Sequence, residues 1–183
     1  MVEQPYVHTV LHDAPIETSR LHLVLLLREA LELLRDGNVN GAEAAQGLDF
    51  TSDFLASVNE SFLTRQLEGL RQRPSSPGWF VRGILRKDDN LLIGHCGFHG
   101  APDLVGRAEI GYTIFARYRR LGYGVESARG LVEWARAQGT PVVYAAVSPD
   151  NISSMGLLTK IGFQRSSVRA DGNDGELVFE LNL

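Results

Sequence analysis

The chain has 183 residues, of which 44% are hydrophobic and 22% charged, and its formal net charge is −4. This is the balance of an ordinary globular protein, so we expect a single domain over residues 1–183. The lone cysteine, Cys96, excludes a disulfide scaffold, and no apolar run approaches the ~20 residues of a membrane span. The opening residues MVEQPYVHTV lack the basic start and apolar core of a signal peptide. We therefore expect a cytoplasmic protein without a membrane partner.

The charge is unevenly distributed about the proline-rich segment 74–78. Before this segment there are 6 Arg and no Lys against 11 acidic residues, and after it 12 Lys and Arg against 11. The acidic first part argues against a general nucleic-acid-binding face, so we expect no direct nucleic-acid partner. A local basic cluster is nevertheless present at Arg117, Arg119 and Arg120.

The first half of the chain is predicted to contain one strand and two helices. Leu21, Leu23 and Leu25 alternate along a strand that opens near residue 18. A short helix follows over residues 28–35 and ends at Gly37. Thr51 or Ser52 then caps a longer helix whose apolar stripe continues to just before residue 74.

The second half alternates strands and helices. Strands over 79–86 and 91–98 are predicted to form a hairpin, and a third strand over 109–115 completes an antiparallel trio. A helix over 122–138 leads to an apolar strand over 142–147. The predicted elements end with a helix that begins after Asn151 and stops at Gly162, strands over 163–169 and 176–181, and a loop over 171–175 between them. The order βαα, βββ, α, β, α, ββ predicts an α+β fold.

The most informative motif is Arg119-x-x-Gly122-x-Gly124, where a predicted strand leads directly into a helix. Glycines allow positive φ and leave no Cβ to block a ligand, so backbone N–H groups can converge on an anion at the positive end of the helix dipole. A Walker loop is excluded because no Gly-Lys-Ser/Thr sequence is present. A dinucleotide fingerprint is disfavoured because Ser127 stands where a third Gly or Ala is required. The alternative is an ordinary glycine turn with surface arginines.

Several motifs together resemble one family. The segment from Arg119 to Glu126 is followed after one strand by Ser148-Pro-Asp-Asn-x-x-Ser154 and then by Lys160-Ile-Gly-Phe163. In this order and spacing, they resemble the GNAT superfamily of acyl-CoA-dependent N-acetyltransferases. The segments Thr18-Ser-Arg-Leu-His-Leu and Leu92-Ile-Gly-His-Cys-Gly-Phe resemble the RimJ/RimL type, which acetylates the N-terminal amines of ribosomal proteins. The resemblance implies a twisted, mostly antiparallel mixed sheet, flanked by helices and splayed at its centre to hold CoA.

The resemblance also implies a binding site for acetyl-CoA as co-substrate. No metal is expected, because His95 and His99 face one way on a strand and Cys96 the other, which leaves at most two ligands on a face. Backbone amides of the glycine loop would bind its pyrophosphate, the last residues of the third strand would meet the pantetheine arm, and Asn151 would contact the same arm. Asn151 can equally serve as a helix N-cap. The implied cofactor-binding residues are Tyr112, Thr113, Ile114, Arg119, Arg120, Leu121, Gly122, Tyr123, Gly124 and Asn151.

Two residues are candidates for catalysis. Glu109 would take a proton from the amine, through a water, and strand alternation puts it on the face of Gly111 and Thr113. The family's usual tyrosine acid is replaced here by Leu158, so Ser154 is expected to assist the departing thiolate instead. Glu109 could also be a surface strand residue, and Ser154 could simply bond its own helix backbone.

The predicted acceptor is a primary amine, with a ribosomal or other protein N-terminus as the main hypothesis. A small amine such as an antibiotic or polyamine is one alternative, and a weakly catalytic CoA-binding sensor or interaction module is another. Glu60, expected mid-helix beside Phe62, is the candidate substrate contact in the acidic first part. Cys96 and Phe62 are expected in the core, and the sequence leaves a homodimer open.

Overall fold

The computed structural model describes residues 14–166 and 175–183. Within these ranges the chain forms eight strands and six α-helices, joined in places by short 3₁₀ turns. In chain order the elements are β1 (Ile16–Glu17), β2 (Leu21–Leu25), α1 (Arg28–Arg35), α2 (Val39–Gln46), α3 (Ser52–Ser57), α4 (Glu60–Gln72), η1 (Pro77–Trp79), β3 (Arg82–Arg86), β4 (Leu92–Phe98), β5 (Arg107–Ile114), η2 (Ala116–Tyr118), α5 (Tyr123–Ala137), β6 (Val142–Val147), α6 (Ile152–Ile161), β7 (Gln164–Arg165) and β8 (Leu177–Asn182).

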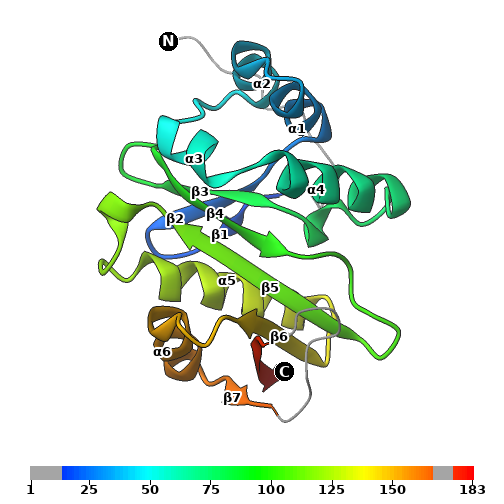
Figure 1. The fold of residues 1–183 in the computed structure, drawn as a ribbon, viewed down its shortest axis with the longest axis vertical. Helices are drawn as coiled ribbons and strands as arrows, with labels where there is room; N and C mark the ends of the chain where they lie inside the picture. Colours follow the sequence, from blue (N-terminus) through cyan, green and yellow to red (C-terminus); the bar gives the residue numbers. More distant parts are fainter. Residues whose placement is uncertain (1–13, 167–174) are drawn as a thin grey trace.

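All the strands belong to one mixed sheet in the order β1-β2-β3-β4-β5-β6-β8-β7. The β5–β6 pair is parallel and every other neighbouring pair is antiparallel. Figure 1 shows α1 to α4 gathered at one end of the view and α5 and α6 at the other, with the sheet between them. The predicted α+β architecture is confirmed.

The parallel pair is short, and this opens the sheet at its centre. Strand β5 pairs with β6 only through Arg107, Ala108 and Glu109, which lie opposite Val142, Val143 and Tyr144. Beyond this point β5 keeps its partner β4 as far as Ile114, and β6 keeps its partner β8. The second half of β5 therefore has peptide groups without a ladder on the side that faces β6. This is the splay that the sequence resemblance implied.

Each face of the sheet carries its own hydrophobic core. Leu21 and Leu23 of β2, fully buried, pack with α5 and α6 residues such as Leu131 and Leu158. On the opposite face α1 to α4 cover a second core, which includes Phe54. Burying apolar area at roughly 25 cal/mol per Å² on both faces fixes the sheet between two layers of helices.

The helix predicted from residue 51 to just before residue 74 is wrong in one respect, because it is two helices. Helix α3 ends at Ser57 and α4 begins at Glu60, with Val58 in extended conformation between them. The cause is a second N-cap: the Asn59 side chain accepts a hydrogen bond from the Phe62 N–H at 2.8 Å. The apolar stripe continues across the break, which is why periodicity alone suggested one helix.

Other boundaries differ from the prediction in smaller ways. The short strand β1 and the helix α2 were not predicted, although Asn38 caps α2 through the Gly41 N–H. The strand expected over 79–86 begins only at Arg82, because residues 77–79 form a 3₁₀ turn. The prediction for α6 is confirmed, and Ile152 in its first turn is exposed.

The terminal pair of strands is confirmed in part. Strand β7 covers two residues of the strand expected over 163–169, and β8 begins at Leu177 rather than at Glu176. Residues 167–169 of that strand, the loop positions 171–174 and the N-terminal sequence 1–13 lie outside the described residues. Within the described residues, no helix has the length and apolar character required to cross a membrane.

Candidate active site

A cavity of about 420 Å³ lies where β5 and β6 separate, and its walls come from both layers of helices. From the α1–α4 side the lining includes Ser57, Phe62 and Gln66, and from the α6 side it includes Asn151 and Ser154. The strands and the residues next to their ends form the rest of the wall, with Val81, His95, Cys96, Gly97, Phe98, His99, Ile110, Gly111, Tyr112, Thr113, Ala145, Ala146, Val147, Ser148 and Glu176. A ligand on one face of the sheet can therefore meet a ligand on the other.

The glycine loop lies between the end of β5 and the start of α5. Arg120 and Gly122 both have positive φ, at 62° and 86°, and these values turn the chain into the helix. In the described chain no side chain caps α5, so the first N–H groups of this 15-residue helix point out of its N-terminus without a side-chain acceptor. Such an end attracts an anion.

The two glycines of the loop have different structural roles. Gly122 provides the left-handed turn, where an L side chain would be strained. Gly124 lies inside α5, and a Cβ there would come within 2.9 Å of Leu157 Cδ1, so its absence lets α5 approach α6. Arg119, expected beside the pyrophosphate, donates its Nε–H to the Ile114 carbonyl at 2.9 Å and holds the loop against the end of β5.

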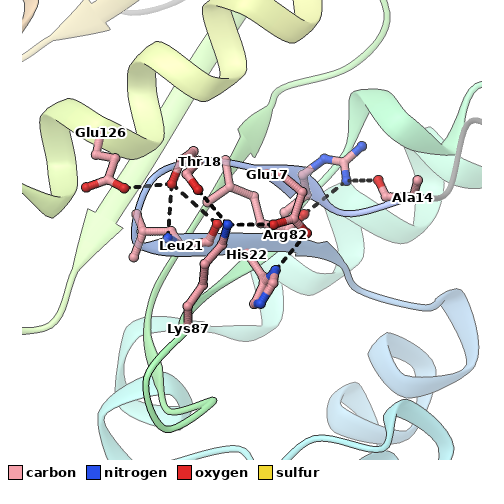
Figure 2. Close-up of polar contacts among 9 residues, drawn as sticks. Ala14, Glu17, Thr18, Leu21, His22, Arg82, Lys87 and Glu126 are labelled. Atoms are coloured by element: carbon pink, nitrogen blue, oxygen red, sulfur yellow. Dashed lines mark hydrogen bonds and ion pairs between the residues drawn. The ribbon is translucent and has the colours of Figure 1, made fainter.

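Arg20, which the sequence did not single out, braces this loop from the β1–β2 turn. Its guanidinium donates to the Leu121 carbonyl at 3.1 Å, stacks 4.5 Å from the Tyr123 ring centroid and pairs with the Glu126 carboxylate at 2.7 Å. Glu126 also accepts a hydrogen bond from the Thr18 hydroxyl at 2.7 Å, which Figure 2 shows. Burial raises the pKa of Glu126, but the bonds from Thr18 and Arg20 outweigh it, so the net pKa lies below the ordinary value.

Ser154 lies beside the gap and is paired with a tyrosine. The hydroxyls of Tyr112 on β5 and Ser154 on α6 are 2.7 Å apart, and both residues line the cavity. Burial raises the pKa of the Tyr112 hydroxyl against the opposing effect of the Ser154 bond, so Tyr112 stays protonated and able to donate. Leu158 is fully buried. Tyr112 was predicted only for its backbone, and the bond of its hydroxyl to Ser154 was not predicted.

Asn151 is the N-cap of α6, one of the two roles that the sequence allowed. Its side-chain oxygen accepts the Ser154 N–H at 3.0 Å and so caps α6. The same residue lines the cavity. The cap fixes the first turn of α6, and with it the position of the Ser154 hydroxyl.

Glu109 lies on the opposite face of the sheet from Tyr112, on the face expected from strand alternation, and is not among the described residues that line the cavity. The imidazole of His99, which does line the cavity, meets it with Nδ1 at 3.0 Å from Oε1. Burial raises the pKa of Glu109, but hydrogen bonds from His99 and Tyr144 outweigh it and leave the carboxyl below its ordinary pKa. Burial and the Glu109 charge raise the pKa of Tyr144 to about 12.

The α1–α4 side of the cavity is aromatic. The Phe62 ring lies 5.3 Å from the His95 ring, and Phe54 meets the same histidine edge-on at 6.0 Å. Burial lowers the pKa of His95 to about 4, so it is neutral. Phe62, expected in the core, packs partly buried against the second core and also lines the cavity. Cys96 is confirmed as a buried core thiol, and burial raises its pKa to about 12.

Two other expectations are corrected or refined. Glu60 is exposed at the first turn of α4, not mid-helix, because Asn59 starts a new helix there; it does not line the described cavity. Arg117 of the basic cluster forms an ion pair with Asp53 of α3 at 2.7 Å. Among the described residues, no group of three or more His, Cys, Asp or Glu side chains is arranged to hold a metal ion.

Comparison with known proteins supports the fold and the family. Over 81 residues the chain is 40% identical to YjdG, an uncharacterized N-acetyltransferase of Bacillus subtilis, covering 44% of this chain and 48% of YjdG. Over 62 residues it is 37% identical to the L-methionine sulfoximine/L-methionine sulfone acetyltransferase of Pseudomonas aeruginosa, covering 33% of this chain and 36% of that enzyme. The match to YjdG thus spans about half of that relative's length, and the match to the Pseudomonas enzyme about a third.

The fold also matches solved acetyltransferase structures. The ribosomal-protein-S5-alanine acetyltransferase of Vibrio fischeri superposes with a TM-score of 0.61 at 16% identity, over 93% of this chain and 97% of that one. Residues 43–164 match the family described as the acetyltransferase (GNAT) domain, whose members use acetyl-CoA as co-substrate. The matched segment runs from α2 to the start of β7 and contains the gap, the glycine loop and the start of α6. The chain belongs to the GNAT acetyltransferase family.

Proposed function

We propose that the protein transfers the acetyl group of acetyl-CoA to a primary amine, and that its main acceptor is the N-terminal α-amine of a protein or peptide. The observation that carries the proposal is the cavity between β5 and β6, which is lined from both faces of the sheet. Such a cavity allows a thioester to enter from the α6 side and an amine to enter from the α1–α4 side.

The donor side fits the chemistry of CoA. The pyrophosphate would be held by backbone N–H groups at Arg119, Arg120, Leu121, Gly122, Tyr123 and Gly124, and the uncapped start of α5 supports this. The pantetheine arm carries amides, and Tyr112, Thr113 and Ile114 would offer it the peptide groups that β6 does not pair. Asn151 would contact the same arm from the first turn of α6.

The acetyl group then moves by direct attack of the amine nitrogen on the thioester carbon. A primary ammonium has to lose a proton first, and Glu109 supplies the negative charge that draws that proton away. As the C–S bond breaks, Ser154 donates a hydrogen bond to the departing sulfur, and Tyr112 holds the Ser154 hydroxyl in place at 2.7 Å. A thiolate is a moderate leaving group near neutral pH, so one hydroxyl donor in a cavity wall can suffice.

An α-amine suits this site better than an alkyl amine. Its ordinary pKa is ~7.7–8.0, against ~10.4 for a lysine side chain, so the free amine is far more abundant at pH 7. The acetyltransferase of V. fischeri, named for a ribosomal protein, supports a protein acceptor, and so does the RimJ/RimL resemblance of the strand Leu92–Phe98. The Pseudomonas relative named for L-methionine derivatives, which also carry an α-amine, favours a small amino-acid acceptor as the second candidate.

Binding and turnover together test the proposal. Thermal unfolding is first measured with acetyl-CoA, CoA, NAD and ATP; a rise in Tm with the first two alone supports the donor site. Release of free thiol is then followed with a peptide that has a free N-terminus, the same peptide N-acetylated, free L-methionine sulfone and spermidine. Thiol release with the free peptide alone is expected. Release with methionine sulfone or spermidine instead would favour a small-molecule acceptor, and binding without any release would favour a CoA-binding sensor.

The remaining expectations are separate from this proposal. A cytoplasmic location and a homodimer stay predictions, and the proposed chemistry depends on neither. Glu60 stays a candidate contact for an acceptor that extends beyond the cavity along the start of α4.

A further inference from the structure

A histidine lies between the carboxylate of Glu109 and the cavity. Of the two residues, only His99 is among those that line the cavity, and its side chain is 42% exposed against 22% for Glu109. Glu109 is further enclosed by Tyr144 of β6, with which it shares a hydrogen bond. An amine in the cavity would therefore meet the imidazole before the carboxylate.

The geometry fixes which nitrogen of His99 can accept a proton. Nδ1 lies 3.0 Å from Glu109 Oε1, and the pKa of Glu109 is held below its ordinary value, so the carboxylate is ionised at neutral pH. An ionised carboxylate only accepts hydrogen bonds, so in the neutral imidazole the hydrogen belongs on Nδ1, beside Glu109, and the lone pair on Nε2. The dyad thus presents a basic nitrogen on the side away from Glu109.

That nitrogen lies over a glycine of the cavity wall. A Cβ built on Gly111 of β5 would come within 2.9 Å of His99 Nε2, so the imidazole occupies space that any other residue at 111 would contest. Gly111 lines the same cavity as His99. The missing side chain lets the ring reach across β5 toward the gap.

A lowered pKa makes Glu109 a weak base by itself. An imidazole is the side chain that ordinarily exchanges protons near neutral pH, and a general base works best when its pKa is close to the working pH. Other charged or titratable groups around the dyad are Tyr144 of β6, Arg65 of α4, which acts on Glu109 through its charge, and Glu176 and His95 in the cavity wall. None of these takes the place of His99 beside the gap, since His95 is enclosed by Phe54 and Phe62.

We propose that His99 is the catalytic base of the acetyl transfer, with Glu109 as its positioning residue; this inference rests on the proposed function. His99 Nε2 takes one proton from the acceptor ammonium, and the lone pair of the resulting amine nitrogen then attacks the thioester carbon. When the C–S bond breaks, the second proton leaves the nitrogen and reaches the thiolate. The products are the N-acetyl amide and CoA-SH, and the proton on His99 returns to solvent.

The test compares His99 with a matched pair elsewhere in the same protein. His22 of β2 also places Nδ1 beside a glutamate, 2.7 Å from Glu17 Oε1, and Figure 2 shows this pair in the β1–β2 hairpin. Neither residue is among the described residues that line the cavity. The variants are His99→Ala, His99→Gln, Glu109→Gln and His22→Ala. The probes are acetyl-CoA and the best amine of the acceptor panel, with kcat/KM measured from pH 5.5 to 9.

His99→Gln is expected to lower kcat/KM at pH 7 by about 10²-fold, the size of a general-base contribution, with acetyl-CoA binding unchanged. Its pH profile should differ in shape from that of the wild type, because the group that takes the proton from the amine is gone. Added free imidazole should restore activity to His99→Ala in proportion to its concentration. Glu109→Gln should lose about 10-fold, because the ring remains but is no longer held. His22→Ala should match the wild type.

A Gly111→Ala variant tests the placement of the ring without removing it. Its Cβ would displace Nε2, so kcat should fall by about 10-fold while the acetyl-CoA Kd stays constant. Gly156→Ala, where a Cβ meets nothing within 4 Å, is the matched control.

Two results would overturn the role of His99 as base while leaving acetyl transfer in place. One is a His99→Gln variant whose kcat/KM equals that of the wild type, and the other is a loss of activity in His99→Ala that imidazole does not restore. Absence of acetyl transfer in the wild type would overturn the proposed function itself, and the base with it.

Discussion

The paired hydroxyls of Tyr112 and Ser154 allow a quantitative prediction about the leaving thiolate. The bond of 2.7 Å joins two neutral groups, one on β5 and one on α6. If Ser154 donates to the sulfur and Tyr112 only orients Ser154, the tyrosine acts entirely through the serine. The two substitutions Tyr112→Phe and Ser154→Ala should then be non-additive.

The expected losses follow from the kind of bond removed. A neutral hydrogen bond is worth about 0.5–1.5 kcal/mol net, so Tyr112→Phe should lower kcat by about 2- to 12-fold. Ser154→Ala removes the donor to the reacting sulfur and should cost up to about 10²-fold, the lower end of the range for an oxyanion donor, because a thiolate needs less help. The double variant should equal Ser154→Ala within about 2-fold, which corresponds to a coupling energy equal to the Tyr112→Phe effect.

The assay is the initial rate of thiol release at saturating acetyl-CoA, with Kd for acetyl-CoA and Tm measured for each variant. Ser153→Ala is the matched control, since Ser153 is the exposed neighbour on α6 and lies outside the described lining of the cavity. Losses that multiply in the double variant would refute the argument, because they would mean that Tyr112 and Ser154 act independently. An unchanged kcat in Ser154→Ala would remove both hydroxyls from the mechanism.

Three further predictions concern the loop, the brace and the thiol. Gly122→Ala should weaken acetyl-CoA binding by about 10-fold, because φ of 86° is strained for alanine; Gly139→Ala, at φ of 79° on the surface, should lose only stability. Because the folded-state pKa of Glu126 is lowered, its contribution to stability is present at neutral pH and declines below about pH 4.5. The difference in urea midpoint between wild type and Glu126→Gln should therefore shrink from pH 7 to pH 4. A constant difference would contradict the pairing of Glu126 with Thr18 and Arg20. Burial with a pKa of about 12 should protect Cys96 from iodoacetamide at pH 8 in the native state but not in urea, so rapid native labelling would count against the buried position.

The parts of the fold that the sequence predicted are those with local signals. Alternating apolar residues identify β2 and β5, and glycines or an asparagine mark the ends of α5 and α6. The break between α3 and α4 could not be predicted in this way, because Asn59 interrupts a stripe that stays apolar on both sides. A cap competes with periodicity only when its hydrogen bond forms, and that is a property of the folded chain.

The candidate site likewise combines residues that the sequence predicts with contacts that it does not predict. Glu109 and Ser154 could be proposed from the resemblance and from strand alternation, but their partners could not. Tyr112 is 42 residues from Ser154 in sequence, and the contact exists only because α6 packs beside the open end of β5. His99 faces Glu109 through the β4–β5 register, which the sequence leaves undefined.

The contacts of Arg20 have a consequence for any shortened form of this protein. The family match begins at residue 43, whereas the side chain that joins Leu121, Tyr123 and Glu126 comes from the turn after β1. A fragment trimmed to the matched segment would keep every residue of the glycine loop but would lose the support that holds it. The glycine loop and the arginine that supports it thus lie in different parts of the chain, and the boundary of the family match is not the boundary of the binding site.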